Sequence, residues 1–132
     1  MKYLLLFIST LVIYLLLDGI WLGVIAKNFY KIKLYFILNN YFNYYVAIFF
    51  YVVYIVGLMH FVILPGITHQ SVLKVFLNGA FFGFLCYATY DLTNMATIKQ
   101  WPFIVTVVDI LWGSLLAALV STASYYVALK IF

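Results

Sequence analysis

The stretch Tyr87-Ala-Thr-Tyr-Asp-Leu-Thr-Asn94 closes a long apolar segment and places a carboxylate and a carboxamide one helical turn apart. Four residues of this segment recur at intervals of four, four and three: Gly83, Tyr87, Asp91 and Asn94. This spacing places them on one face of a helix. Because charged side chains are costly against lipid, the face is expected to point into a bundle of helices. The stretch therefore predicts a membrane helix and a candidate site.

The composition of the whole chain indicates an integral membrane protein. Of its 132 residues, 69% are hydrophobic and 8% are charged. A soluble domain carries about a quarter of charged residues, so this chain cannot cover a surface that faces water. The net charge of +4 comes from lysines scattered at segment ends. They suit topology and anchoring, whereas nucleic-acid binding needs a basic patch on a soluble face. We expect one compact domain over residues 1–132.

Four apolar segments are long enough to cross a bilayer, for which about 20 residues suffice. They cover residues 3–25, 44–64, 71–98 and 103–131. The first is too long for a signal peptide and lacks a small-residue cleavage site, so we expect it to be retained. The second is expected to end at Leu64, because Pro65-Gly66 follows. The predicted fold class is all-α, with four transmembrane helices and both termini on one side.

Residues 26–43 form the only long connection. Three lysines, Lys27, Lys31 and Lys33, are interleaved with aromatic and aliphatic side chains. This mixture is typical of a short helix in the headgroup layer, with lysines toward phosphate and rings toward acyl chains. The sequence leaves two interpretations open. The segment is either a plain connector at the membrane surface or a lid over a lipid-binding site.

The only three acidic residues of the chain lie inside apolar segments at one depth. Asp18 is seven residues from the end of the first segment, Asp91 seven from the end of the third, and Asp109 six from the start of the fourth. Since a helix rises about 1.5 Å per residue, each lies about 10 Å from the same end of the bundle. Such residues normally face the bundle interior and mark sites or pathways.

Three close carboxylates without a basic partner cannot all stay ionised in a low-dielectric interior. Shared protons, a bound cation or hydrogen bonds from neighbouring groups would each resolve the conflict, and the last would make the cluster a structural lock on helix register. If a metal is bound, oxygen ligands favour Mg²⁺ or Ca²⁺. The candidate ligands are Asp18, Asp91, Asn94 and Asp109. No zinc is expected, because the first and fourth segments contain no His or Cys.

Two tryptophans follow two of the aspartates by three residues, in Asp18-Gly-Ile-Trp21 and Asp109-Ile-Leu-Trp112. Each ring is therefore one helical turn from its aspartate. The candidate ligand- or ion-binding residues are Asp18, Trp21, Tyr87, Asp91, Asn94, Asp109 and Trp112. No catalytic residue can be named, because the chain has no phosphate-binding loop, Ser-His-Asp order or metalloprotease motif.

The same residues carry a resemblance to a known family. Its motifs are similar to Asp18-x-x-Trp21-Leu-Gly23, the stretch from Tyr87 to Asn94, the Trp101-Pro102 pair and Asp109-x-x-Trp112-Gly113. The chain thus resembles domain-of-unknown-function family 2177 over nearly its whole length. The resemblance implies a bacterial, four-helix protein of the inner membrane, and it implies no activity.

Three functions remain open at this point. In a carrier, the aspartates would exchange protons or a cation for a substrate along a water-accessible path. In a membrane enzyme acting on a lipid or isoprenoid, a carboxylate pair would serve as acid and base, beside an apolar groove that opens sideways to lipid. In a structural or accessory subunit, the polar cluster would only fix packing.

The expected partners are membrane lipids. Small-residue stripes such as Gly19-xxx-Gly23 suit either helix packing within one bundle or a homodimer, and the sequence leaves both open. No nucleic acid is expected. Lysines slightly favour the aspartate end as cytoplasmic. That end carries Lys27, Lys31, Lys33 and Lys99, and the other end carries Lys2, Lys74 and Lys130.

Overall fold

A computed structural model describes residues 1–39 and 41–132, and this part of the chain is mostly helical and contains no strand. The first span is α1 (Lys2–Ile20) with the π-helix η1 (Trp21–Ile25), followed by α2 (Lys27–Lys33). The second is α3 (Tyr44–Leu58), η2 (Met59–Ile63) and α4 (Leu64–His69), and the third and fourth are α5 (Val72–Thr97) and α6 (Phe103–Ile131). The predicted all-α class, with four apolar helices and a short helix between the first two, is confirmed.

The second span is longer than the sequence predicts. The prediction ended it at Leu64, whereas the helical run continues to His69. Pro65 lies in the first turn of α4, directly after the π-helical turn η2. Proline lacks an N–H and crowds the preceding turn of an α-helix, and the wider π-turn relieves both problems. The chain reverses instead at Gln70, whose φ of 51° is left-handed.

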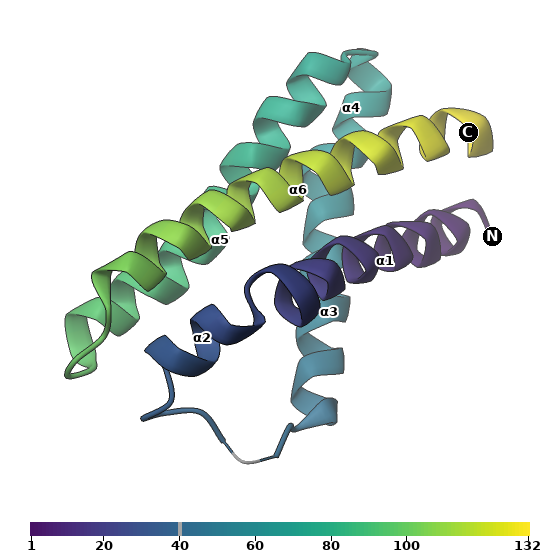
Figure 1. Cartoon of the computed structure of the whole chain (residues 1–132). Coiled ribbons are helices and arrows are strands. Elements are labelled where there is room, and N and C mark those ends of the chain that lie inside the picture. The colour runs from purple at the N-terminus through teal and green to yellow at the C-terminus, as the bar shows by residue number, and fades with distance from the viewer. Residues whose placement is uncertain (40) are drawn as a thin grey trace.

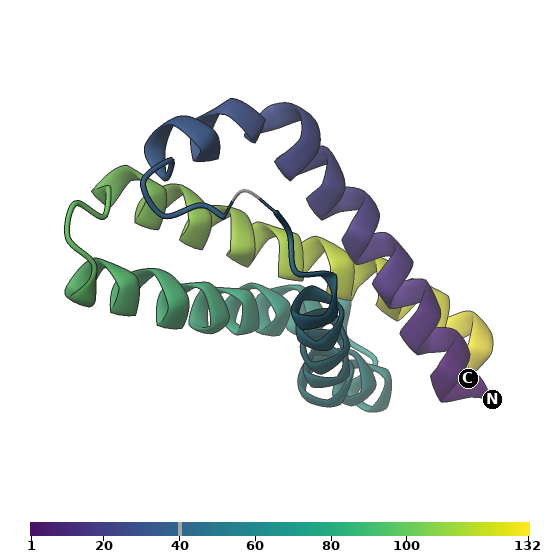
Figure 2. The ribbon, with the colours of Figure 1, turned by 90° about the horizontal axis from the view of Figure 1, so that it is seen from below.

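The largest contact in the molecule joins α5 and α6, which run antiparallel side by side (Figures 1 and 2). Two glycines of α5 permit this approach. A Cβ at Gly83 would overlap the backbone carbonyl of Gly113, and a Cβ at Gly79 would lie 2.9 Å from the carbonyl oxygen of Ala117. The small-residue stripes of the third and fourth segments therefore pack against each other within one chain.

The first two spans lie against this hairpin in different ways. α1 packs along α6, and the two chain termini lie near each other (Figure 1). α3 crosses steeply and meets α5 at Gly57, where a Cβ would lie 3.2 Å from the ring of Phe82 (Figure 2). From this crossing, the N-terminal half of α3 and the C-terminal half of α5 diverge toward the end of the molecule where α2 lies (Figures 1 and 2).

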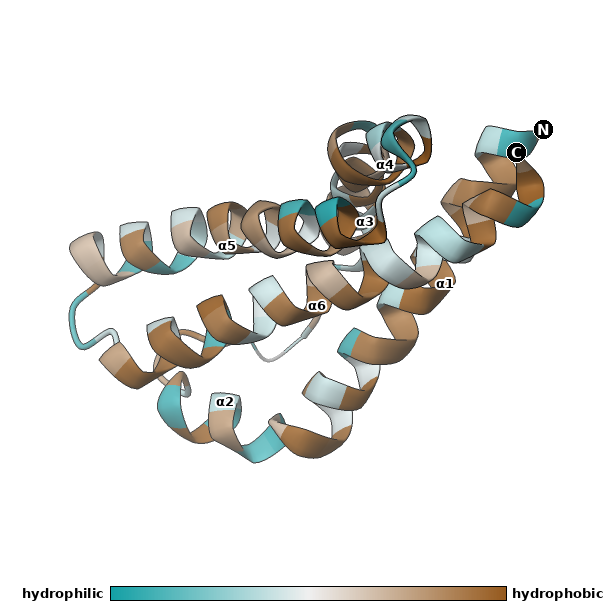
Figure 3. Ribbon diagram, turned by 90° about the horizontal axis from the view of Figure 1, so that it is seen from above, coloured by the Kyte–Doolittle hydropathy of each residue, from teal (hydrophilic) through white to brown (hydrophobic). Residues whose placement is uncertain are grey.

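The outer faces of the spans are apolar. Figure 3 shows hydrophobic residues over most of the helices, with hydrophilic ones mainly on α2 and at helix ends. Large side chains such as Phe49, Phe61 and Leu111 are 71, 65 and 66% exposed. The packed core, which includes Leu6, Tyr14, Ile55, Leu58 and Leu116, lies between the helices. So much exposed apolar surface suits lipid and not water, and the protein is a multi-pass membrane protein.

Candidate functional site

A cavity of about 300 Å³, which we call the aspartate cavity, lies where α2 and the C-terminal end of the first span meet α5 and α6. Its wall contains five of the residues predicted from sequence: Asp18, Trp21, Tyr87, Asp109 and Trp112. Two more tyrosines, Tyr30 and Tyr90, and three leucines complete it. Carboxylates from the first and fourth spans thus share one hollow with a wall of aromatic rings.

The first aspartate is held by the tryptophan of the fourth span. Trp112 Nε1 donates a hydrogen bond to Asp18 Oδ1 at 3.2 Å. The ring of Trp112 stacks on that of Trp21, with centroids 4.5 Å apart and planes inclined by 10°. The two indoles therefore join the first and fourth spans through both a hydrogen bond and a stack. Asp18 is left only 7% exposed.

The second aspartate is held through the connector helix α2. The hydroxyl group of Tyr30 donates to Asp109 Oδ1 and accepts a hydrogen bond from Trp21 Nε1 at 3.1 Å. Burial, and then the hydrogen bond to Asp109, raise the pKa of the Tyr30 hydroxyl, so it stays protonated as a donor. Each tryptophan thus serves the aspartate of the other span, Trp112 directly and Trp21 through Tyr30.

Asp91 lies behind the aspartate cavity and not in its wall. It is 0% exposed, and neither of its carboxylate oxygens receives a hydrogen bond from a described residue. Its neighbour is Asp109, whose carboxyl group lies within hydrogen-bonding reach. Two carboxylates in contact repel each other. A proton or a cation between them would satisfy both.

The four candidate metal ligands are not gathered around one point. Asn94 does not line the cavity and lies half-buried, one turn beyond Asp91 and beside Tyr90. Within residues 1–39 and 41–132, no three His, Cys, Asp or Glu side chains are arranged to hold a metal ion. Asp91 and Asp109 are neighbours, while Asp18 shares only the cavity wall with Asp109.

Three tyrosines at this site, Tyr14, Tyr30 and Tyr90, are not among the candidate residues predicted from sequence. Tyr30 belongs to the connector, where an aromatic ring is typical of a membrane anchor. The interpretation of residues 26–43 as a lid is the one signal in the sequence that points to a role for Tyr30 at the site. Tyr14 lies one turn before Asp18 on the same helix face, and its hydroxyl is 3.3 Å from that of Tyr87. Tyr14 is 1% exposed. This tyrosine pair joins α1 to α5 beneath the cavity.

A family comparison covers both the bundle and the cavity. The model of a family described as predicted membrane protein (DUF2177) matches residues 3–126. The chain belongs to this family. The match contains every residue that lines the aspartate cavity. No curated protein and no solved structure shows significant similarity to the chain.

In this DUF2177 protein, two further hollows adjoin the aspartate cavity through shared wall residues. One, of about 880 Å³, lies along the connector and the start of α3 and shares Leu38 and Tyr90 with the cavity. The other, of about 320 Å³, lies between α3 and α5 and shares Tyr87 and Tyr90. We call the latter the α3–α5 groove. Its lining residues are Phe50, Tyr54, Cys86, Tyr87 and Tyr90. A largely apolar groove therefore lies next to the polar cavity.

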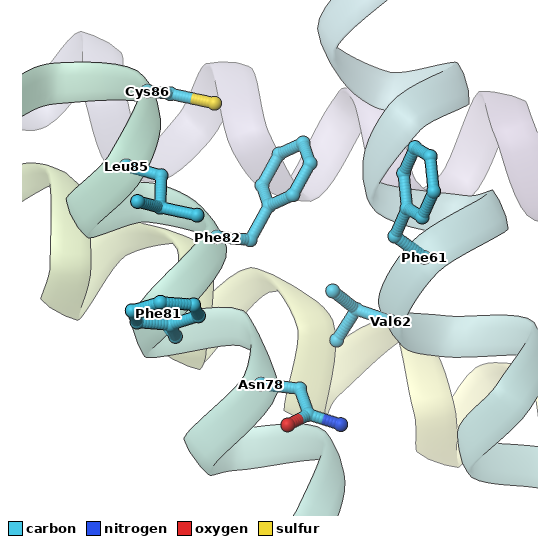
Figure 4. A pocket seen from close by; sticks show the side chains of 7 residues that line it. All are labelled: Phe61, Val62, Asn78, Phe81, Phe82, Leu85 and Cys86. Atoms are coloured by element: carbon cyan, nitrogen blue, oxygen red, sulfur yellow. The ribbon is translucent and has the colours of Figure 1, made fainter. Parts of the chain in front are cut away.

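Another groove, of about 400 Å³, lies on the other side of the α3–α5 crossing, between η2 and α5, and shares Cys86 with the α3–α5 groove (Figure 4). Its walls are Phe61 and Val62 on one side and Phe81, Phe82 and Leu85 on the other. Asn78 lies at one end and Cys86 at the other (Figure 4). None of these residues is a carboxylate or a histidine. This groove could therefore hold an apolar group but lacks the acidic side chains of the aspartate cavity.

Proposed function

We propose that this membrane protein binds an amphiphilic ligand, with its polar end in the aspartate cavity and its apolar part in the α3–α5 groove. The observation that carries the proposal is that the two hollows are adjacent, because Tyr87 and Tyr90 belong to both walls. A ligand that reaches from Asp18 and Asp109 to the ring of Phe50 has to be polar at one end and apolar at the other.

The direction of access also supports a lipidic ligand. The halves of α3 and α5 that flank the groove diverge (Figures 1 and 2). Two of its lining residues, Phe50 and Tyr90, are 46 and 55% exposed. An acyl chain in the bilayer can therefore enter sideways. At the polar end, α2 carries exposed lysines, which suits a helix in the headgroup layer, and its Tyr30 contributes to the cavity wall.

The contact between Asp91 and Asp109 favours a second candidate, a proton-coupled carrier that uses the same cavity. A proton held between these carboxyl groups and a cationic ligand beside Asp109 would compete for the same negative charge. Ligand binding would then release a proton, which is the elementary step of exchange. An enzyme acting on a lipid or isoprenoid would need the same groove, whereas a structural subunit would leave it without a ligand.

The proposal is tested by filling the α3–α5 groove. Cys86 is half-buried in its wall, so Cys86→Phe would occupy the space of an acyl chain. The matched control is Leu111→Phe, which places the same ring at a position that is 66% exposed. Native mass spectrometry of protein incubated with a bacterial lipid extract and washed in detergent would count the amphiphiles that remain bound.

We expect the wild-type protein and Leu111→Phe to retain one amphiphile per chain and Cys86→Phe to lose it. Retention by all three proteins, or by none, would overturn the proposal. The thermal unfolding of Cys86→Phe, compared with that of Leu111→Phe, shows whether the groove variant is folded.

A further inference from the structure

We propose that the polar end of the ligand is an ammonium group, so that the aspartate cavity recognises a cationic or zwitterionic amphiphile. This inference rests on the proposed function and specifies the head of its ligand. Three features of the described residues carry it: two half-satisfied carboxylates in the cavity wall, a third carboxylate without any donor, and a lining of aromatic rings.

Asp18 and Asp109 each have one oxygen in a hydrogen bond and one without. Trp112 donates to Oδ1 of Asp18, and Tyr30 donates to Oδ1 of Asp109. In the described part of the chain, neither Oδ2 receives a hydrogen bond. Both side chains line the cavity and are only 7 and 8% exposed, so the accessible part of each carboxylate faces this hollow. An ammonium group consists of donors without acceptors, which is the complement of these oxygens.

The third carboxylate, Asp91, shows independently that the cluster lacks positive charge. It is completely buried, it is directed at Asp109, and neither of its oxygens receives a hydrogen bond from a described residue. No lysine or histidine is among the groups that act on the three aspartates. If one proton is shared between Asp91 and Asp109, that pair and an ionised Asp18 still carry negative charge at low dielectric, which is unfavourable. A cationic ligand would supply the missing charge.

The rest of the wall favours an organic cation over a bare ion. Trp21 and Trp112 are stacked, and Tyr30, Tyr87 and Tyr90 line the same hollow. Aromatic faces attract ammonium groups through their quadrupole. No three side chains in the described residues form a metal-holding group. A phosphate or carboxylate head would be repelled by the aspartates, and a neutral hydroxyl head would gain hydrogen bonds without charge compensation.

The test is a series of amphiphiles that share a dodecyl tail and differ in the head. The probes are dodecylammonium, dodecylphosphoethanolamine, dodecanol and dodecyl phosphate, added to the protein in dodecyl maltoside micelles. Their affinities are read from the change in tryptophan fluorescence, to which Trp21 and Trp112 in the cavity wall contribute together with Trp101, and from the mass of the complex. Because the tail is constant, differences report the head. We expect dodecylammonium to bind about tenfold more tightly than dodecanol, and dodecyl phosphate to bind more weakly than dodecanol.

Two variants show whether the aspartates recognise the ammonium group. Asp18→Asn keeps the shape of the side chain and removes its charge, so it should reduce the preference for dodecylammonium over dodecanol severalfold. Lys130→Gln changes the net charge by one unit in the opposite direction, at the far end of α6, and should leave the preference unchanged. Dodecylphosphoethanolamine that binds as well as dodecylammonium would identify a phospholipid headgroup as the source of the ammonium. Binding of dodecylammonium alone would identify a free amphiphilic amine.

The outcomes separate this inference from the proposed function. Equal binding of dodecylammonium and dodecanol, abolished by Cys86→Phe, would overturn the ammonium head and leave the amphiphile site standing. A preference for dodecylammonium that survives both Asp18→Asn and Asp109→Asn would also overturn the inference, since other residues would then recognise the charge of the ammonium group. If none of the four probes binds, both proposals are wrong. The selectivity of the wild-type protein remains decisive even if an aspartate variant does not fold.

Discussion

Tyr30 connects the membrane-surface helix to the aspartates through two hydrogen bonds, one donated to Asp109 and one accepted from Trp21. Tyr30→Phe would remove both and leave the Trp21 N–H without its acceptor. We expect a loss of about 0.5–2 kcal/mol in the free energy of unfolding. The measurement is unfolding in mixed dodecyl sulfate micelles. Tyr35→Phe is the matched control, because Tyr35 lies just beyond α2 and is 77% exposed.

The same substitution gives a pH dependence with a defined sign. Burial and Asp109 raise the pKa of Tyr30 in the folded protein, whereas the unfolded phenol titrates at about 10. Above that pH the folded state binds more protons than the unfolded state, so stability falls as pH rises. Tyr30→Phe lacks this contribution and should lose less stability than wild type between about pH 10 and 11. Parallel losses in the two proteins would contradict the buried position of the hydroxyl.

Asp91 and Asp109 should carry one proton between them at neutral pH, because nothing else in the described residues satisfies Asp91. Infrared spectra should therefore contain a band of a protonated carboxyl group in wild type and in Asp18→Asn. The band should disappear in Asp91→Asn, since the amide N–H can then donate to Asp109 in place of the proton. If wild type lacks this band, another cation lies between the two carboxylates. A shift of the carboxylate bands on adding Mg²⁺ or Ca²⁺ would then identify that cation as a metal.

At the scale of the elements, the α5–α6 contact depends on glycine. Gly83→Ala would drive a Cβ into the backbone carbonyl of Gly113, which cannot move aside without separating the helices. We expect a loss of about 1–3 kcal/mol in the free energy of unfolding. Gly19→Ala is the matched control, because in the described part of the chain no atom beyond its own helical turn lies within 4 Å of a Cβ at that position. The control should stay within about 1 kcal/mol of wild type, because alanine favours helix.

The helices were predictable where composition alone determines them, and less so where backbone details matter. Length and apolar character suffice for four spans, since a membrane leaves the backbone few alternatives to helix. The end of the second span was wrong because the breaker rule for Pro65 assumes an α-helical turn before it, and η2 supplies a π-helical one. Nothing in the spacing of apolar residues distinguishes these two turns.

The candidate site was predictable in depth but not in its partners. Counting residues from segment ends placed the aspartates on one level, and two of them line one cavity with the third beside it. The hydrogen bond from Tyr30 depends on how α2 folds back over the bundle, and the α3–α5 groove depends on the steep crossing at Gly57. Both are set by tertiary packing, which a single sequence does not reveal.

At the scale of the whole molecule, the small-residue faces differ in what they contact. Gly79 and Gly83 are used within the chain, while a Cβ at Gly19 or Gly23 would meet no atom within 4 Å in the described residues. The expected homodimer stays a prediction. If a second copy binds, the first span is the face that remains open for close approach.

The arrangement of the spans makes the sidedness of the protein testable. Both termini lie together, and α2 lies at the opposite end (Figure 1). For the bacterial inner membrane that the family resemblance implies, we propose that the α2 end lies in the cytoplasm, because that end carries one lysine more than the other. In a Cys86→Ser background, Lys31→Cys should then be protected from an impermeant maleimide on intact cells. Lys74→Cys and Lys130→Cys should both be labelled.

Labelling of Lys31→Cys alone would reverse the orientation and preserve the four-span topology, because the two cysteines of the other end would still agree. A disagreement between Lys74→Cys and Lys130→Cys would contradict the topology itself, since α5 begins and α6 ends on the same side.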